Sequence, residues 1–192
     1  GNATRALAFL LLALVAVSKG DSNWQWSTTV GETYLYHAYA AYCPEEQLAN
    51  WDCTWCQEPG VSDFTPSYFS YDLKTDGFGY VGYSKADKAI VVSFRGTEAD
   101  KIRDWIVDLR SIKQVPYKNV TNVMVAKGFY NSWNSLSNNI LRGVASLNAT
   151  YPDYNIWVTG HSLGAALSTL CALELAELGY SSDRIQVYNF GS

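Results

Sequence analysis

The chain has 192 residues, 48% of them apolar, and carries 14 Lys and Arg against 18 Asp and Glu, for a net charge of −4. This length suits one domain with a substantial buried core and leaves little room for a second. Because binding to phosphates requires clustered Lys and Arg, which the sequence lacks, we expect no nucleic-acid partner.

The first twenty residues have the layout of a secretory signal peptide. Arg5 precedes an unbroken apolar run over 6–17, and small or turn-favouring residues follow up to Gly20. The run is shorter than the roughly 20 residues that span a bilayer, so we expect cleavage near Gly20 rather than a transmembrane anchor or a buried helix. Residues 21–192 then form the N-terminal portion of a single domain, located outside the cell or in the lumen of a lysosome-like compartment.

Three of the four cysteines, Cys43, Cys53 and Cys56, lie close together in a Trp-rich segment. In an exported chain this spacing is typical of a disulfide, although the sequence does not tell which two pair. The alternative is a zinc site in which His37 joins the three thiolates, but paired ligand dipeptides are missing and we expect no metal. Cys171 lies in an apolar helical stretch, where we expect a buried free thiol; alternatively, the odd thiol pairs with a cysteine beyond residue 192.

Two N-glycosylation acceptor patterns fit an exported protein. They are Asn119-Val-Thr121 and Asn148-Ala-Thr150. A third match, Asn2-Ala-Thr4, falls in the segment that we expect to be removed.

The first half of the chain changes its pattern near residue 77. Residues 34–43 form an apolar and aromatic stretch that favours a helix, and 57–76, with Pro, Gly, Ser and Asp, favours connection. Gly79 to Tyr83 and Ala89 to Phe94 are rich in Tyr, Val and Ile and are separated by a five-residue turn at 84–88. This predicts a hairpin of two strands.

The second half alternates helical and strand patterns. Gly128 to Leu147 has apolar residues at spacings of three and four, which predicts a helix with one apolar face. Ile156 to Thr159 is a short buried strand, Ala165 to Leu178 a helix ended by Gly179, and Ile185 to Phe190 another strand. Such alternation predicts an α/β fold with a central, mostly parallel sheet flanked by helices.

The sequence Gly160-His161-Ser162-Leu163-Gly164 lies where the predicted strand meets the predicted helix. A sharp strand-to-helix turn exposes a serine hydroxyl at the top of a sheet, and the flanking glycines let strand and helix pack closely around it. We therefore interpret Ser162 as a nucleophile rather than as part of a structural glycine-rich turn.

Together with Val92-Ser93-Phe94-Arg95-Gly96-Thr97, Asp104-Trp105 and Asp108-Leu109, this motif resembles the class 3 lipase family of secreted fungal triacylglycerol lipases. The resemblance covers residues 34–192 in the same order. It implies the α/β-hydrolase fold, with the C-terminal part of that fold absent from these 192 residues.

The resemblance also implies two further parts of a site. The oxyanion hole would consist of Thr97, through its backbone N–H and hydroxyl, and Leu163, through its backbone N–H. The segment 100–110 would be a lid, with Ile102, Trp105 and Ile106 on its apolar face; a surface helix packed permanently on the core is the alternative.

Neither histidine suits the catalytic base. His161 adjoins Ser162 with its side chain directed away, and His37 is expected to be packed in the N-terminal helix. The fold supplies its triad in the order Ser, Asp, His. Glu174 and Glu177 belong to a helix and Asp183 precedes a strand, so we assign none of them and expect the triad Asp and His beyond residue 192, with this chain inactive as given.

These inferences predict a secreted carboxylic ester hydrolase, a triacylglycerol lipase of lipid catabolism, that works through a serine acyl-enzyme without cofactor. Its partner would be a lipid or other ester at an oil–water or membrane interface. The alternatives are phospholipase A1, a feruloyl-type esterase, or a catalytically dead lipid-binding protein.

Overall fold

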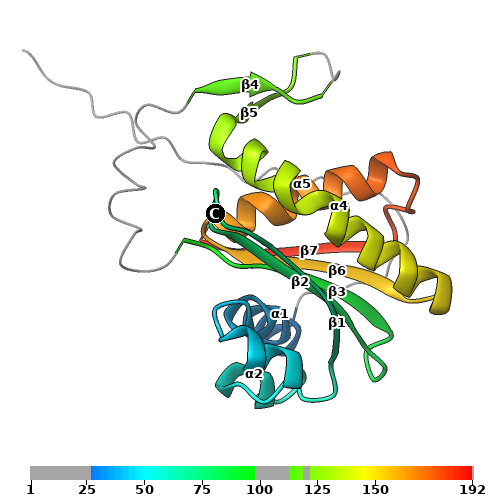
Figure 1. The fold of residues 1–192 in the computed structure, drawn as a ribbon. Helices are drawn as coiled ribbons and strands as arrows, with labels where there is room; N and C mark the ends of the chain where they lie inside the picture. Colours follow the sequence, from blue (N-terminus) through cyan, green and yellow to red (C-terminus); the bar gives the residue numbers. More distant parts are fainter. Residues whose placement is uncertain (1–26, 98–112, 119–121, 192) are drawn as a thin grey trace, which may run out of the picture.

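The computed structural model of the protein describes residues 27–97, 113–118 and 122–191. Its elements follow one another along the chain as shown in Figure 1. They are α1 Thr28–Ala40, α2 Glu45–Asn50, the 3-10 helix η1 Thr54–Gln57, β1 Thr65–Asp72, β2 Gly77–Ser84, β3 Ala89–Phe94, β4 Gln114–Pro116, β5 Met124–Ala126, α4 Lys127–Thr150, β6 Asn155–His161, α5 Leu163–Glu177 and β7 Ile185–Phe190.

The central sheet has the strand order β1-β2-β3-β6-β7. β2 is antiparallel to both of its neighbours, whereas β3, β6 and β7 pair in parallel. Four of the five strands therefore run in the same direction, which confirms the predicted mostly parallel sheet. The predicted hairpin, the strands at 156–159 and 185–190, and the two long helices are all present.

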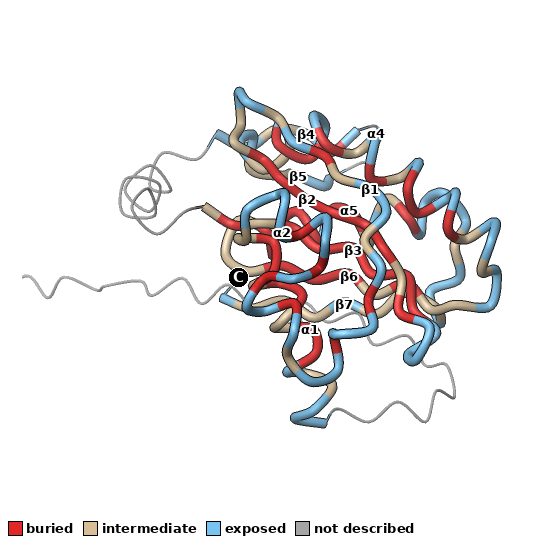
Figure 2. Tube along the Cα trace, turned by 60° about the horizontal axis from the view of Figure 1, so that its bottom comes forward, coloured by how far each residue is buried: buried red, intermediate tan, exposed pale blue. Residues whose placement is uncertain are grey.

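Helices cover both faces of the sheet, with α4 and α5 on one side and α1 and α2 on the other (Figure 1). The side chains of β3 alternate between them: Ile90 and Val92 join the core beneath α4 and α5, and Ala89 and Val91 join the core beneath α1 and α2. Because both faces are buried, the strand is apolar apart from Ser93 rather than alternating with polar residues. Figure 2 shows buried residues along β2 and β3, whereas the edge strand β1 is mostly intermediate or exposed.

The two long helices follow the predicted patterns. The buried residues of α4 include Trp133, Leu136, Ile140 and Val144, at the predicted spacings. Helix α5 is followed by Gly179, at φ 91°, the left-handed conformation that favours glycine at a helix end.

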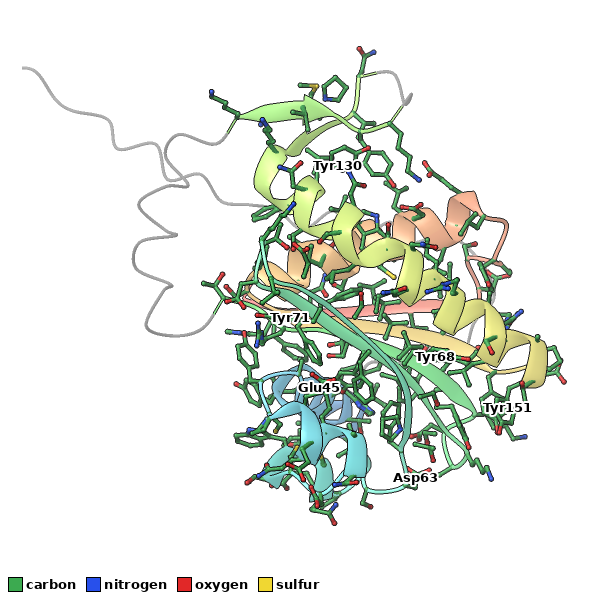
Figure 3. All side chains as sticks on the ribbon, in the orientation of Figure 1. Glu45, Asp63, Tyr68, Tyr71, Tyr130 and Tyr151 are labelled. Carbon is green, nitrogen blue, oxygen red and sulfur yellow. A yellow bond between two sulfur atoms is a disulfide. The ribbon has the colours of Figure 1, made fainter. Side chains whose placement is uncertain are left out.

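Two parts of the sheet structure differ from the sequence prediction. Residues 57–76 were predicted as connection, but Thr65–Asp72 form the edge strand β1. Pro66 lies there beside a register shift, and an edge strand tolerates such a proline because one side of its backbone needs no partner. Tyr68, labelled in Figure 3, joins β1 to α4 by donating a hydrogen bond from its hydroxyl to Ser146 Oγ at 2.7 Å. The other difference is the small hairpin of β4 and β5, which was not predicted.

Among the described residues, no helix is both long enough and apolar enough to cross a membrane. The predicted signal peptide at 1–20 lies outside the described residues.

Candidate active site

Ser162 lies at the turn between β6, which ends at His161, and α5, which begins at Leu163. Its backbone has φ 56° and ψ −123°, a conformation that residues other than glycine rarely adopt. Holding such a residue costs on the order of 1–3 kcal/mol and requires the surroundings to enforce it. Ser162 is half-buried, so this strained residue remains accessible to solvent.

The two glycines of the motif are required by close packing. A Cβ atom on Gly160 would meet the backbone of Gly164, and one on Gly164 would meet the carbonyl of Phe94 and lie 3.1 Å from the carbonyl carbon of Arg95. All of these contacts are with backbone, which cannot rotate away as a side chain can. The predicted reason for the glycines, close packing of strand and helix around the turn, is therefore visible in the structure.

The loop that follows β3, residues 95–97, packs against this turn. A Cβ on Gly96 would lie 3.1 Å from Ser162 Cβ and would also meet the carbonyl oxygen of His161. Phe94 pairs with Gly160 in the parallel ladder, so the loop and the turn leave the sheet side by side. Thr97, the predicted oxyanion-hole residue, is half-buried and follows Gly96 directly.

An ion pair holds the start of this loop from the other side. Arg95 Nη2 donates to the Asp76 carboxylate at 2.8 Å and to the Asp76 carbonyl at 2.9 Å, and the Arg95 amide donates to the carbonyl of Phe78 at 3.0 Å. The position of the loop is thus fixed by the β1–β2 turn as well as by the strand from which it emerges.

Leu163 is the first residue of α5, so its N–H lacks an acceptor within the helix. The positive end of the helix dipole adds to this effect. A free N–H at the N-terminus of a helix suits a developing negative charge beside Ser162.

The two histidines have different surroundings. His37 is fully buried in α1, and its Nδ1 lies 3.1 Å from the hydroxyl of Tyr80, which donates to the His37 carbonyl at 2.8 Å. Burial lowers the pKa of His37 to about 3, although the charge of Asp63 acts in the opposite direction. His161 is half-buried, and its Nδ1 lies 2.9 Å from the hydroxyl of Tyr42.

The acids that the sequence left unassigned take part in structural contacts. Glu174 accepts a hydrogen bond from Trp133 Nε1 at 2.7 Å and forms an ion pair with Lys118 at 2.8 Å. Glu177 pairs with the same lysine at 3.2 Å, and Asp183 is exposed in the turn before β7.

The cysteine cluster contains a disulfide, as predicted, between Cys53 and Cys56. The three sulfur atoms, including that of the free Cys43, lie within 4.8 Å of one another. With two of them bonded to each other and His37 directed at Tyr80, these residues do not form the alternative zinc site. Cys171 is a buried free thiol, and burial raises its pKa.

Some of the remaining predicted residues lie in the described part of the chain and some do not. Asn148 lies in the last turn of α4, where its side-chain oxygen accepts a hydrogen bond from Arg184 at 2.8 Å. The lid residues Ile102, Trp105 and Ile106 and the acceptor Asn119 lie outside the described residues.

Tyr42 is the neighbour of the site that the sequence did not single out. Its hydroxyl contacts Gly96 and His161, which lie 54 and 119 residues further along the chain. No local pattern reports contacts over such separations, so only the folded structure could find them.

A sheet of mostly parallel strands with helices on both faces, and a strained serine between a central strand and the helix after it, define an α/β-hydrolase fold. Residues 91–192, more than half of the chain, match the family described as Lipase (class 3). The chain belongs to this family.

Relatives and solved structures agree with this assignment. A lipase of Rhizomucor miehei is 34% identical over 145 residues, which are 74% of this chain and 39% of the relative. Secreted mono- and diacylglycerol lipase A of Penicillium cyclopium is 33% identical over 69% of this chain and 43% of its own length. The structure of lipase II from Rhizopus niveus superposes with a TM-score of 0.76 at 31% identity, covering 84% of this chain and 60% of that one. The chain thus spans less than half the length of these two curated relatives.

Proposed function

We propose that the protein is a secreted carboxylic ester hydrolase, in particular a triacylglycerol lipase, with Ser162 as its nucleophile. The observation that carries this proposal is the strained backbone of Ser162 at the β6–α5 turn, with loop 95–97 packed against it. The names of the relatives, which include a secreted alkaline triacylglycerol lipase and mono- and diacylglycerol lipases, support the substrate class.

The proposed reaction uses the residues of this site in fixed roles. Ser162 Oγ attacks the ester carbonyl carbon while a base accepts its proton, and the resulting oxyanion accepts hydrogen bonds from Thr97 and Leu163. Collapse of this intermediate breaks the ester C–O bond, and the alcohol leaves with the proton from the base. Water then attacks the acyl group on Ser162 by the same route and releases the acid. Each oxyanion donor contributes about 3 kcal/mol to such a step.

We assign neither histidine as the base. His37 is buried and bonded to Tyr80, and His161 is bonded to Tyr42. We propose that the triad Asp and His lie beyond residue 192 and that a polypeptide of residues 21–192 has no turnover, because an unassisted serine hydroxyl is a poor nucleophile.

The cellular setting and the lid remain part of this proposal. Several relatives are named as secreted proteins, which supports export after removal of residues 1–20 and glycosylation at Asn119 and Asn148. An amphipathic segment with Ile102, Trp105 and Ile106 on one face would cover the acyl cleft and open at a lipid surface.

A fluorophosphonate probe tests the nucleophile in the full-length protein. We expect the probe to label the wild type and to leave Ser162→Ala unlabelled, because the phosphonate bonds only to an activated serine. Ser137→Ala, which removes a hydroxyl from α4, is the matched control and should label as the wild type does. Equal labelling of Ser162→Ala and the wild type would refute the hydrolase assignment.

Hydrolysis rates on a substrate panel test the specificity. Emulsified triglyceride should be hydrolysed faster than phosphatidylcholine vesicles or a feruloyl ester, the substrates of the two alternative enzymes. A protein that binds emulsion without reacting with the probe would instead be the lipid-binding alternative.

A further inference from the structure

The hydroxyl of Tyr42 joins two loops beside Ser162. Tyr42 lies in the turn that follows α1 and is half-buried. Its oxygen accepts a hydrogen bond from the N–H of Gly96 at 3.1 Å and lies 2.9 Å from Nδ1 of His161. One side chain, from the opposite end of the sequence, therefore contacts both the loop after β3 and the end of β6.

Each of these two partners is the immediate neighbour of a proposed functional residue. Gly96 precedes Thr97, and His161 precedes Ser162. The loops are in close contact, since a Cβ on Gly96 would lie 3.1 Å from Ser162 Cβ and would also meet the Tyr42 oxygen. A hydroxyl that bonds to both loops fixes how they lie relative to each other.

We propose that Tyr42 is a positioning residue for ester hydrolysis, which holds the loop 95–97 against the β6–α5 turn so that the amide of Thr97 is directed at the oxyanion before the reaction begins. Tyr42 acts through Gly96 and His161. The inference rests on the function proposed above, because it assigns Tyr42 a role in positioning the oxyanion hole of that reaction.

The directions of the hydrogen bonds are consistent with this role. The N–H of Gly96 can only donate, so the Tyr42 oxygen is the acceptor and the phenol proton is free for Nδ1 of His161. Burial raises the pKa of Tyr42, although its hydrogen bond with Gly96 opposes the effect, so the phenol stays protonated and able to donate.

The substitution Tyr42→Phe in the full-length enzyme removes only this hydroxyl. The control is Tyr39→Phe, because Tyr39 lies near the end of α1, shortly before Tyr42, and its ring lies 6.2 Å from the ring of His161. Within the described part of the chain, the Tyr39 hydroxyl makes no hydrogen bond. The measurements are kcat and KM on a soluble short-chain ester and the rate of phosphonylation of Ser162. Titration of active sites with the fluorophosphonate restricts kcat to folded enzyme.

We expect Tyr42→Phe to lower kcat per titrated site about tenfold or more with KM within about twofold, because misplacement of a catalytic group by about 1 Å can cost a hundredfold in rate. The phosphonylation rate should fall in proportion, and Tyr39→Phe should leave both rates within about twofold of the wild type. Unchanged kcat for Tyr42→Phe, a change confined to KM, or an equal loss for Tyr39→Phe would overturn the inference. If Ser162→Ala abolishes labelling while Tyr42→Phe reacts at the wild-type rate, only the role of Tyr42 fails.

Discussion

The regions around the two histidines, His37 and His161, differ in burial and in backbone geometry. Around His37 the packing is complete: Trp51, Phe64 and Tyr80 surround the ring, and burial lowers its pKa to about 3. Around His161 the chain is half-buried, and the next residue, Ser162, has a strained backbone. The same residue type therefore stabilises the fold in one place and adjoins the proposed chemistry in the other, according to burial and backbone geometry.

The largest expected effect tests whether the β6–α5 turn lacks room for a side chain at Gly164. Gly164→Ala would place a Cβ against the backbone of Phe94 and Arg95, which cannot move without shifting β3. We expect the free energy of unfolding, measured by urea denaturation, to fall by about 3 kcal/mol.

Gly128→Ala is the control for that experiment, since a Cβ there would meet nothing within 4 Å in α4. Alanine should raise stability at this position by about 0.5 kcal/mol through its helix propensity. If Gly164→Ala proved as stable as Gly128→Ala, the turn would have room that the structure does not show.

A smaller effect tests the buried histidine through pH. The folded pKa of His37 is about 3, below its ordinary value of 6.5, because burial disfavours the charged ring. Between these two values the unfolded chain binds a proton that the folded chain does not, so stability falls as pH falls. The loss should approach 1.4 kcal/mol per pH unit and reach about 2.5 kcal/mol at pH 4.5 relative to pH 7.

His37→Gln isolates this contribution, because glutamine keeps a hydrogen-bond donor but does not titrate. Urea midpoints of both proteins between pH 7 and pH 4.5 should show a shallower pH dependence for the variant. Parallel curves for the two proteins would mean that His37 titrates normally in the fold.

The smallest effect lies outside both regions, where Lys118 of the β4–β5 turn pairs with Glu174 and Glu177 of α5. Lys118→Met should cost less than about 1 kcal/mol of unfolding free energy, because the lysine is about one-third exposed and solvent screens the pairs. High salt should reduce the difference from the wild type, whereas the control Lys85→Met in the exposed β2–β3 turn should show none. A cost independent of salt would point to packing instead.

Most of the central fold could be predicted because its residues follow simple periodicities. The hairpin at 77–94, the helices α4 and α5 and the strand β6 each bury a continuous run or a regular face, whereas β7 is only partly buried. The motif around Ser162 could be placed as well, since it joins a predicted strand to a predicted helix.

The parts that were missed lack such a local signal. β1 is an edge strand, and its Pro66, Ser67 and Ser70 are residues typical of loops; its pairing with β2 makes it a strand. β4 and β5 are only three residues long. The cysteine spacing could not distinguish the pair Cys53–Cys56 from pairs with Cys43, and Tyr42 is brought to the site only by tertiary packing.

The parallel register of β3 and β6 determines how accurately the loop after β3 and the turn after β6 are aligned. Ile90 pairs with Ile156, Val92 with Val158 and Phe94 with Gly160. The segments that follow β3 and β6 therefore leave the sheet at the same level. A slip of one residue would displace one segment by about 3.3 Å and send its apolar side chains to the wrong face. The aliphatic residues inside the sheet therefore determine how well the Thr97 amide and the Ser162 hydroxyl are aligned at its edge. Substitution of these aliphatic residues can slow the proposed reaction although they do not contact the substrate.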